Sequence, residues 1–341
     1  MNALPIIDIA PLITGNRNTA LQVVNQLGQA ARETGFFYVV NHSVPLQDIE
    51  AAYQMAKTFF SQPDAYKQTY YIGRSVNHRG YVPFSEKGSY ADEVCRHYEA
   101  FDLALELPSD DPDYLAGNLL LGPNVWPDLA GFQTQIYRYY QAIAGLGRIL
   151  MKAFELHLGL ALGTFTNQMS KPISQLRLIH YVRPNETKQN NTVNMGAHTD
   201  YECLTLLHQC HEGLQAMTLD NIWIDIPVRP EAFLVNTGDM LETWTNGIFR
   251  STPHRVKNVH PERYSMPYFV ATNYDTVIKP LDRFVTVRTP AMYQPFKAGL
   301  HLERMLRRDF PYLRTRKSKA FEISPKTPMN NPFENRITFQ D

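Results

Sequence analysis

Five residues of this 341-residue chain have the types and the spacing to bind a metal and a small acid. His198 and Asp200 are separated by one residue, His254 follows 54 residues after Asp200, and Arg263 and Ser265 come shortly afterwards. In a strand, side chains at positions i and i+2 point to the same face, so we expect His198 and Asp200 to aim at one point. Two imidazoles and one carboxylate are the ligand set of a non-haem Fe(II) site with open coordination positions. Zinc is the alternative metal for this set.

The pair formed by Arg263 and Ser265 makes iron the favoured metal. A guanidinium can hold a carboxylate through two hydrogen bonds, and a hydroxyl on the same strand face can add a third. Such a pair suits the distal carboxylate of 2-oxoglutarate, whose keto-acid end would chelate the iron at two open positions. A single His-x-Asp motif or a single arginine is common by chance. The prediction therefore depends on Arg263 following His254 by nine residues, on a segment with a β pattern.

The second half of the chain is predicted to supply the strands that position these residues. Short runs rich in β-branched and aromatic residues are separated by turn residues, at intervals typical of a sandwich or jelly roll. The predicted strands are 176–181, 205–207, 223–226, 233–236, 254–259 and 264–271. A jelly roll places strands side by side that are distant in sequence, so His254 can lie next to His198 and Asp200. We expect a mainly β fold with α-helices, built on a jelly-roll core.

The first half of the chain is predicted to be mostly helical and to pack onto the β half. Apolar residues recur there at helical spacing, and an aromatic run predicts a strand at 36–40. The expected helices are 21–31, 47–61, 136–154 and 298–310, with irregular chain at 70–127 and from Ser324 onward. Gly147 is expected to allow close packing of the third helix. The expected organisation is one unit, 1–341, with a helical part (1–172), a jelly-roll core holding the metal site (173–290), and a C-terminal helix and tail (291–341).

The composition excludes several other classes of protein. The chain is 44% hydrophobic and 19% charged, which suits a large buried core and is too apolar for a disordered chain. Its 33 basic and 33 acidic residues cancel, so no strong field attracts nucleic acid or an anionic membrane. No apolar run approaches the ~20 residues of a membrane span, and the first residues lack the pattern of a secretory signal. Three cysteines form no disulfide framework, so we expect a cytoplasmic protein. The balanced charge favours a small-molecule partner. A monomer is compatible with the sequence.

Taken together, the motifs resemble the isopenicillin N synthase-like family of Fe(II)/2-oxoglutarate-dependent oxygenases. The resemblance covers nearly the whole chain, and the combination of segments is far more specific than any one of them. The strongest segments are 198–200 (HTD), 236–239 (NTGD), 244–247 (WTNG), 254–256 (HRV) and 263–265 (RYS), supported by 5–8, 35–38, 41–42, 79–81, 99–102, 120–126 and 176–181. The resemblance implies a double-stranded β-helix core. It also implies His198, Asp200 and His254 as iron ligands, and Arg263 and Ser265 as anchors for 2-oxoglutarate.

The resemblance and the local pattern suggest roles for a few further residues. Tyr181 stands where the family has a tyrosine facing the cosubstrate, which implies a hydrogen bond to 2-oxoglutarate; the alternative is a buried core tyrosine. Arg79 lies in a segment that contacts substrate in family members, which implies binding of a substrate carboxylate; the alternative is a structural or solvated arginine. Asn236 and Asp239 are expected to form a turn between two strands. Residues 208–211 (HQCH) have a spacing that fits no standard zinc site, so we expect no site there.

The function implied by the resemblance is the oxidation of a small molecule. The enzyme would use Fe(II), O2 and 2-oxoglutarate, release succinate and CO2, and by default hydroxylate a metabolite or an intermediate of natural-product (secondary) metabolism. Two alternatives stay open. One is an iron oxidase or cyclase of the isopenicillin N synthase type, which needs no 2-oxoglutarate and uses the Arg-Ser pair for another carboxylate. The other is a non-catalytic jelly-roll protein that binds a small acid.

Overall fold

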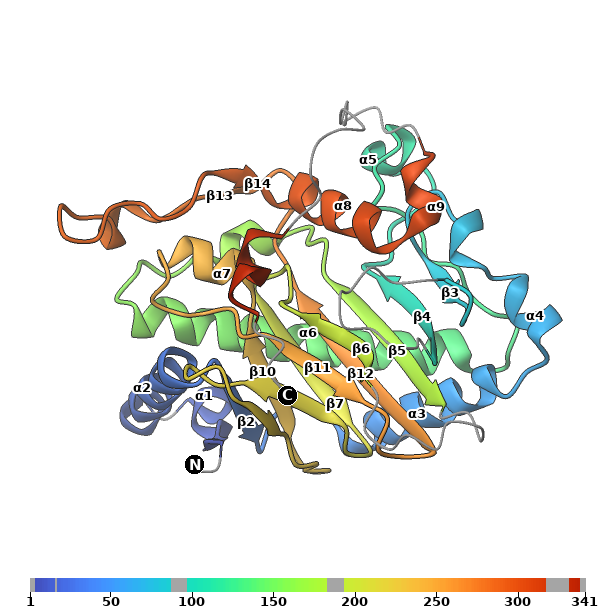
Figure 1. Ribbon diagram of the computed structural model, residues 1–341, viewed down its shortest axis with the longest axis horizontal. Helices are drawn as coiled ribbons and strands as arrows, with labels where there is room; N and C mark the ends of the chain where they lie inside the picture. Colours follow the sequence, from blue (N-terminus) through green and yellow to red (C-terminus); the bar gives the residue numbers. More distant parts are fainter. Residues whose placement is uncertain (1–3, 16, 87–96, 183–192, 317–330, 338–341) are drawn as a thin grey trace.

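Long helices lie mainly in the first half of the chain and most strands lie in the second half, as the sequence predicts (Figure 1). The computed structural model describes residues 4–15, 17–86, 97–182, 193–316 and 331–337. The strands are β1 (Ile6–Asp8), β2 (Phe36–Val40), β3 (Gly80–Val82), β4 (Tyr98–Ala104), β5 (Gln175–Val182), β6 (Val193–His198), β7 (Leu204–Gln209), β8 (Leu214–Met217), β9 (Trp223–Asp225), β10 (Phe233–Thr237), β11 (His254–Lys257), β12 (Glu262–Val270), β13 (Val277–Ile278) and β14 (Phe296–Lys297). The α-helices are α1 (Ala10–Thr14), α2 (Arg17–Glu33), α3 (Leu46–Phe60), α4 (Asp64–Gln68), α5 (Pro112–Leu115), α6 (Phe132–His157), α7 (Asp239–Trp244), α8 (Ala298–Asp309) and α9 (Pro311–Arg314). The short 3-10 helices are η1 (Ile72–Arg74), η2 (Thr166–Met169), η3 (Asp282–Phe284) and η4 (Pro332–Arg336).

Two antiparallel layers of strands build the β half. The larger sheet has the order β1-β2-β10-β7-β12-β5-β4-β3, and the smaller sheet has the order β6-β11-β8-β9. Only β1 with β2 pairs in parallel within these two sheets, among the strands described. One pocket is lined from both sheets, with Tyr181 and Arg263 on the larger sheet and His198 and His254 on the smaller one. This arrangement confirms the predicted jelly-roll core.

One face of β5 and β12 forms a wall of that pocket. The two strands pair antiparallel, with Arg263 opposite Tyr181 and Phe269 opposite Gln175. Side chains at alternate positions of a strand share a face. Every second residue of the two strands accordingly lines the pocket: Gln175, Arg177, Ile179 and Tyr181 on β5, and Arg263, Ser265, Pro267 and Phe269 on β12. The register thus brings residues that are about 80 positions apart in sequence onto one surface.

Helix α6 covers the outer face of the larger sheet (Figure 1), where it contacts β12 and β7, while α2 and α3 pack against α6. Its buried side includes the predicted apolar positions from Ile136 to Phe154. Gly147 faces β12 at close range, because a Cβ atom added there would lie 2.8 Å from Val270 Cγ2. The predicted close packing at Gly147 is therefore confirmed.

The prediction of irregular chain at 70–127 is wrong for β3 and β4. Strand β4 is buried along its whole length and pairs with β5 in the larger sheet. Two of its residues are acidic, which hides the strand pattern in the sequence, but each acid has a basic partner. Lys67 Nζ lies 2.7 Å from Glu99 Oε2, and Arg177 contacts Asp102 through two hydrogen bonds of 2.7 Å. Strands β6 and β8 were also not predicted.

The C-terminal part returns to the β half. Helix α8, predicted at 298–310, lies over one end of the pocket, which Leu302 and Leu306 help to line. Asn331 Nδ2 then donates hydrogen bonds to Thr199 Oγ1 (3.1 Å) and to Asp239 Oδ2 (2.8 Å). Residues 324–330 and 338–341 of the predicted irregular tail lie outside the described residues, and the described part of the tail contains the 3-10 helix η4.

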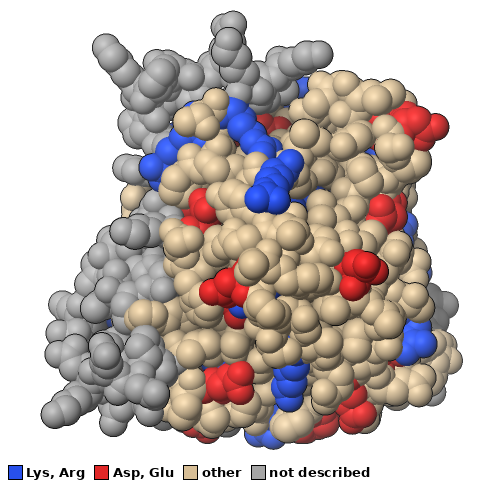
Figure 2. Space-filling view, turned by 90° about the vertical axis from the view of Figure 1, so that its right-hand side faces the viewer, with Lys and Arg blue, Asp and Glu red and all other residues tan. Residues whose placement is uncertain are grey.

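The surface shows charges of both signs. On the face in Figure 2, acidic side chains are scattered over the area and basic ones occur near its top and near its bottom. Neither sign covers a wide area of this face, in keeping with the balanced composition. Among the described residues, no helix combines the length and the apolar character that crossing a bilayer requires.

Candidate active site

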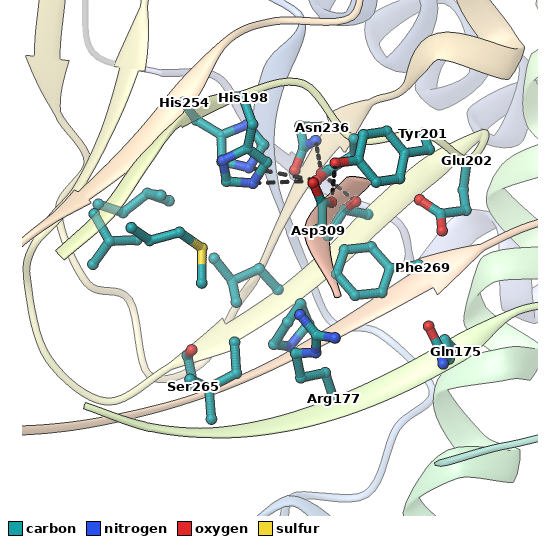
Figure 3. Close-up of a pocket in the computed structure, with 18 of the residues that line it drawn as sticks. Gln175, Arg177, His198, Tyr201, Glu202, Asn236, His254, Ser265, Phe269 and Asp309 are labelled. Atoms are coloured by element: carbon teal, nitrogen blue, oxygen red, sulfur yellow. Dashed lines mark hydrogen bonds and ion pairs between the residues drawn. The ribbon is translucent and has the colours of Figure 1, made fainter. Parts of the chain in front are cut away.

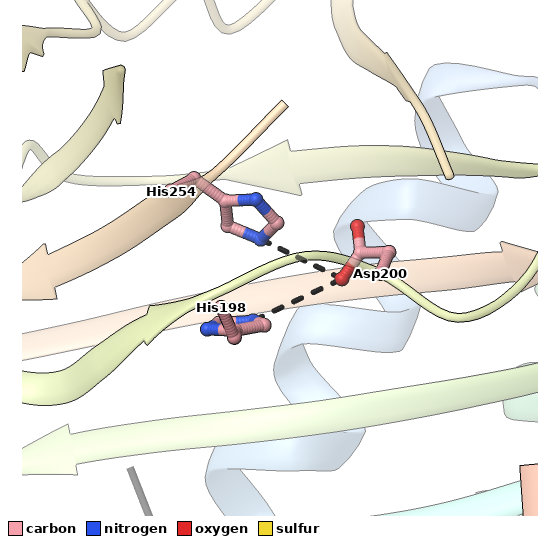
Figure 4. Close-up of side chains that lie close together, drawn as sticks. All are labelled: His198, Asp200 and His254. Carbon is pink, nitrogen blue, oxygen red and sulfur yellow. Dashed lines mark ion pairs between the residues drawn. The ribbon is translucent and has the colours of Figure 1, made fainter. Parts of the chain in front are cut away.

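Three side chains with metal-binding atoms meet at the ends of β6 and β11 (Figure 4). His198 is the last residue of β6 and His254 is the first residue of β11, and the two are direct partners in the strand pairing. Asp200 follows two residues after His198, and its Oδ1 lies 3.8 Å from His198 Nε2 and 3.5 Å from His254 Nε2. All three residues are buried, and their ligand atoms lie within 4.8 Å of one another. His198, Asp200 and His254 therefore lie together in the structure, as the sequence predicted.

The Asp200 carboxylate is oriented differently from what the sequence predicted. Asp200 lies beyond the end of β6, in the connection to β7, so strand alternation does not aim its carboxylate. Two hydrogen bonds do this instead: Asn236 Nδ2 donates to Asp200 Oδ2 at 2.7 Å, and the Thr205 hydroxyl donates to the same oxygen. Oδ2 is thereby satisfied by protein groups, while Oδ1 faces the two imidazoles.

Both imidazoles are held in the orientation that a metal ligand needs. His198 Nδ1 donates to the Gly196 carbonyl oxygen at 2.8 Å, and His254 Nδ1 donates to the Thr252 carbonyl oxygen at 3.2 Å. A hydrogen bond from Nδ1–H to a backbone carbonyl fixes the tautomer, so that Nε2 carries a lone pair. In each ring that Nε2 atom is the one near Asp200 Oδ1.

The electrostatics of the cluster favour the protonation state of a metal site. Burial, followed by the neighbouring His254, lowers the pKa of His198 to about 4. Burial alone would raise the pKa of Asp200, but the two imidazoles and the hydrogen bonds from Thr205 and Asn236 lower it overall. Near neutral pH His198 is thus neutral and Asp200 is ionised, as binding of a divalent metal requires. Geometry, tautomers and charge all fit Fe(II).

Arg263 is a buried cation on the opposite wall of the pocket. Its guanidinium is held by neutral groups only, among the residues that the structure describes. Nη2 donates to Gln209 Oε1 (2.7 Å), Nε donates to the His211 carbonyl oxygen (3.1 Å), and Nη1 lies 3.3 Å from Ser265 Oγ. The group also lies over the Tyr181 ring, 4.7 Å from its centroid. Only 3% of Arg263 is exposed, and no carboxylate from the described chain pairs with it.

Burying a charge is costly unless an opposite charge or a full set of hydrogen bonds compensates it. Arg263, Ser265 and Tyr181 all line the pocket, so an anion inside the pocket can compensate the guanidinium. The structure therefore brings the three predicted anchor residues together. It also supplies Gln209, which the sequence did not single out, as a group that orients the guanidinium.

The other end of the pocket carries polar side chains that sequence reasoning missed (Figure 3). Gln175, Arg177 and Glu202 line it together with Phe269, and the apolar side of α8 closes it. Arg177 forms a two-pronged ion pair with Asp102. Burial, followed by the charge of Asp200, raises the pKa of the Glu202 carboxyl to about 8. Gln175 and Arg177 could have been predicted to line the pocket, because strand alternation places both on the same face of β5 as Tyr181.

Arg79 does not reach this pocket. It is 1% exposed, and its guanidinium donates to the backbone carbonyl oxygens of Asn77 (2.9 Å), His78 (3.0 Å) and Leu120 (2.6 Å). It is absent from the residues that line the pocket. The expectation that Arg79 binds a substrate carboxylate is therefore corrected: its donors are used to hold separate parts of the chain together.

Two other expectations concern polar residues near the site. Asn236 lies inside β10, and Asp239 is the first residue of α7, so the two do not form the expected turn between strands. His208 is a satisfied core residue, because its Nδ1 accepts from the Tyr53 hydroxyl (2.9 Å) and its Nε2 donates to the Pro230 carbonyl oxygen (3.0 Å). In the described part of the chain, the one group of three or more His, Cys, Asp or Glu side chains close enough to share a metal is the cluster at Asp200.

The amino-acid sequence is similar to those of known proteins. Residues 4–129 match the family described as non-haem dioxygenase in morphine synthesis N-terminal, and residues 173–272 match the 2OG-Fe(II) oxygenase superfamily. Clavatol oxidase claD of Penicillium crustosum is 33% identical over 299 residues, which cover 82% of this chain and 88% of that protein. Homoarginine-6-hydroxylase 2-ODD-C23 of Glycine max is 34% identical over 303 residues, covering 84% and 90%.

Solved structures agree with the sequence relatives. A full-length Neurospora crassa protein, crystallised in complex with alpha-KG, has a TM-score of 0.77 to this structure at 25% identity, covering 89% of this chain and 96% of that one. The similarity extends over both the helical part and the β half. Sequence, fold and cluster geometry agree, and the chain belongs to the 2OG-Fe(II) oxygenase superfamily.

Proposed function

We propose that this protein uses Fe(II), 2-oxoglutarate and O2 to hydroxylate a small molecule. His198 Nε2, His254 Nε2 and Asp200 Oδ1 are the proposed metal ligands. The proposal is supported by the hydrogen bonds that occupy the other polar atom of each side chain. Fe(II) bound there would supply the activation of O2 that is coupled to decarboxylation of 2-oxoglutarate to succinate and CO2.

The observation that carries the proposal is the buried guanidinium of Arg263. It faces the pocket and, within the described chain, no carboxylate neutralises it. We assign it to the distal carboxylate of 2-oxoglutarate, with Ser265 as a second donor and Tyr181 beneath the guanidinium. The Neurospora crassa protein described above was solved in complex with alpha-KG, which supports the assignment by similarity.

The chain's own groups would perform the remaining tasks. Arg263 and Ser265 would bind and orient the cosubstrate, while Asn236 and Thr205 would hold Asp200 in one orientation. The apolar side of α8 would exclude water from the end of the pocket next to Phe269. A small molecule fits this arrangement, and the two relatives described above are named as an oxidase and a hydroxylase.

The test is 2-oxoglutarate-dependent formation of succinate by the purified protein, with the anaerobic charge-transfer band of Fe(II) and 2-oxoglutarate as a binding readout. We expect Arg263→Gln to raise the KM for 2-oxoglutarate about 100-fold, since breaking a buried ion pair removes about 3 kcal/mol or more. Arg229→Gln is the matched control, because the Arg229 side chain is 36% exposed and lies outside the pocket lining.

Other outcomes would select the alternatives. Turnover with Fe(II) and O2 but without 2-oxoglutarate would identify an iron oxidase or cyclase of the isopenicillin N synthase type. A protein that binds a small acid but no Fe(II) under anaerobic conditions would be a non-catalytic binder.

We further propose that residues 1–341 act as a single unit in the cytoplasm. The single unit is supported by β2 and β4, which come from the first 172 residues and share the larger sheet with β5, β7, β10 and β12. The reducing compartment is supported by Cys203 and Cys210, which are free thiols; Cys95 lies outside the described residues.

A further inference from the structure

The pocket has a second end that the cosubstrate does not need. Along β12, Arg263 and Phe269 are six residues apart, and along β5 Tyr181 and Gln175 are six residues apart. At about 3.3 Å per residue, each wall runs for roughly 20 Å. A five-carbon diacid at Arg263 therefore leaves the end near Phe269 and Gln175 for the molecule to be oxidised.

Two of the charged groups at this end already have charged partners from the protein. Arg177 is paired with Asp102 through two hydrogen bonds of 2.7 Å. Asp309 is paired with Arg308, whose Nε lies 2.8 Å from Asp309 Oδ1. Arg308 also contacts Glu334, and the Tyr201 hydroxyl donates to Asp309 Oδ2. Arg177 and Asp309 therefore both have partners from the protein.

Glu202 is different from these pairs. It is 4% exposed and lines the pocket. Its carboxylate accepts a hydrogen bond from its own backbone N–H, but no side chain of the described residues donates to it, so most of its acceptor capacity is left for a ligand. The nearby Gln175 is 5% exposed, and its Nε2 likewise has no partner in the described chain. In Figure 3, both side chains lie on the side of Phe269 that is away from His198 and His254, and no dashed line reaches either one.

Buried polar groups in folded proteins nearly always have hydrogen-bond partners, and a buried acid with a single backbone donor recovers only part of the hydration it had in the unfolded chain. A carboxyl group accepts hydrogen bonds in both its ionised and its protonated form. The amide Nε2 of Gln175 can only donate. A ligand that satisfies both residues must offer a donor to one and an acceptor to the other.

We propose that Glu202 and Gln175 select the substrate by its polar head: Glu202 accepts from an N–H or O–H group and Gln175 donates to a carbonyl or similar acceptor. The rest of the substrate is apolar, because Phe269, Leu302 and Leu306 form the adjoining walls. Amides, lactams and hydroxy-ketones on an apolar body have this chemistry. The inference rests on the proposed function, since it names the substrate class of the same pocket.

The test uses four probes of similar size that differ in the head group: benzamide, benzamidine, N,N-dimethylbenzamide and methyl benzoate. Their dissociation constants are measured by ligand-detected NMR on the full chain with Fe(II) and 2-oxoglutarate under anaerobic conditions. We expect benzamide to bind about tenfold more tightly than N,N-dimethylbenzamide and methyl benzoate, which lack donors, since one hydrogen bond is worth about that ratio. In Glu202→Leu this preference should disappear, whereas Gln175→Leu should weaken benzamide and methyl benzoate alike.

Glu202→Gln separates the two kinds of donor. If the protein recognises a neutral donor, this variant keeps benzamide binding, and if it recognises a cation, the variant loses a preference for benzamidine. Either result, together with loss of the donor preference in Glu202→Leu, supports Glu202 as the acceptor. Glu231→Gln is the matched control, because the Glu231 side chain is 60% exposed and outside the pocket lining.

Stability gives a readout that does not depend on any ligand. Replacing a buried carboxylate that lacks a side-chain partner by an amide of the same shape, whose oxygen can still accept from the backbone N–H, should leave the melting temperature of Glu202→Gln unchanged or raise it. A marked fall would show that Glu202 has a structural role and would overturn the inference. Equal binding of probes with and without donors, or no binding of any donor-bearing probe, would overturn it as well. Retention of the Fe(II)–2-oxoglutarate charge-transfer band in the Glu202 variants would show that such a failure leaves the proposed function intact.

Discussion

Asn236 is predicted to control metal affinity without touching the metal. Its Nδ2 donates to Asp200 Oδ2 at 2.7 Å, and the Thr205 hydroxyl donates to the same oxygen. Removing a partner that orients a metal ligand typically weakens metal binding about 10- to 100-fold. A hydrogen bond to a charged group contributes about 1.5–3 kcal/mol. Because a tenfold change in a binding constant corresponds to about 1.4 kcal/mol, this energy agrees with a roughly 10- to 100-fold loss of metal affinity. We expect Asn236→Ala to raise the dissociation constant for Fe(II) within this range.

The assay is an anaerobic titration of the metal-free protein with Fe(II), followed by the charge-transfer band after addition of 2-oxoglutarate. Thr205→Val removes the second donor with little change of shape, and the double variant should lose more affinity than either single one. Asn236 is 2% exposed, so the folded fraction of each variant is first measured by circular dichroism. A folded Asn236→Ala protein with the Fe(II) affinity of the wild type would refute the role assigned to this hydrogen bond.

Three further predictions concern stability. Burial lowers the pKa of His208 to about 4, so the stability that neutral His208 contributes is complete above pH 6.5 and is lost as the pH falls towards 4. The loss in the free energy of unfolding is about 3 kcal/mol at most. Urea titrations across this pH range should show a smaller loss in His208→Gln. Asn331→Ala should lower the free energy of unfolding by about 1–3 kcal/mol, because two buried hydrogen bonds are lost, and unchanged stability would contradict their importance. Gly147→Ala should destabilise by about 1–3 kcal/mol through overpacking. The matched Gly145→Ala has nothing within 4 Å of the new Cβ and should stabilise by up to about 1 kcal/mol, so equal melting temperatures for the two variants would refute the packing argument.

The sequence predicts those features that depend on local pattern. Apolar periodicity located α3, α6 and α8, and β-branched runs located β5, β7, β10 and β12, all within a few residues. Strand β4 escaped because Glu99 and Asp102 break its apolar pattern. Their basic partners, Lys67 and Arg177, come from distant parts of the chain, and nothing in a local window reveals such pairing.

The same limit applies to the site. Residue types and spacing were enough to predict that His198, Asp200 and His254 meet, since jelly-roll pairing sets β6 beside β11. Asn236 was assigned to a turn because asparagine favours turns, yet it occupies a buried strand position where its amide holds Asp200. The role of Asn236 could have been predicted from its position, because it is a polar residue near the end of an apolar strand. Arg79 was misassigned because an arginine bound only to backbone carbonyls leaves no charge pattern in the sequence.

The two ends of the pocket have opposite chemical demands, and the strand geometry keeps them apart. Arg263 at one end is a buried cation that lacks a carboxylate partner in the described chain, whereas Glu202 at the other end is a buried acid that lacks a donor from another side chain there. We therefore expect the end with Arg263 to select an anion and the end with Glu202 to select a hydrogen-bond donor. Because Arg263 and Phe269 are six residues apart on β12 and Gln175 lies opposite Phe269 on β5, a substitution at Gln175 or Phe269 can change the substrate without moving Arg263. We therefore expect the specificity of this enzyme to be altered from the Gln175 end while its affinity for 2-oxoglutarate is retained.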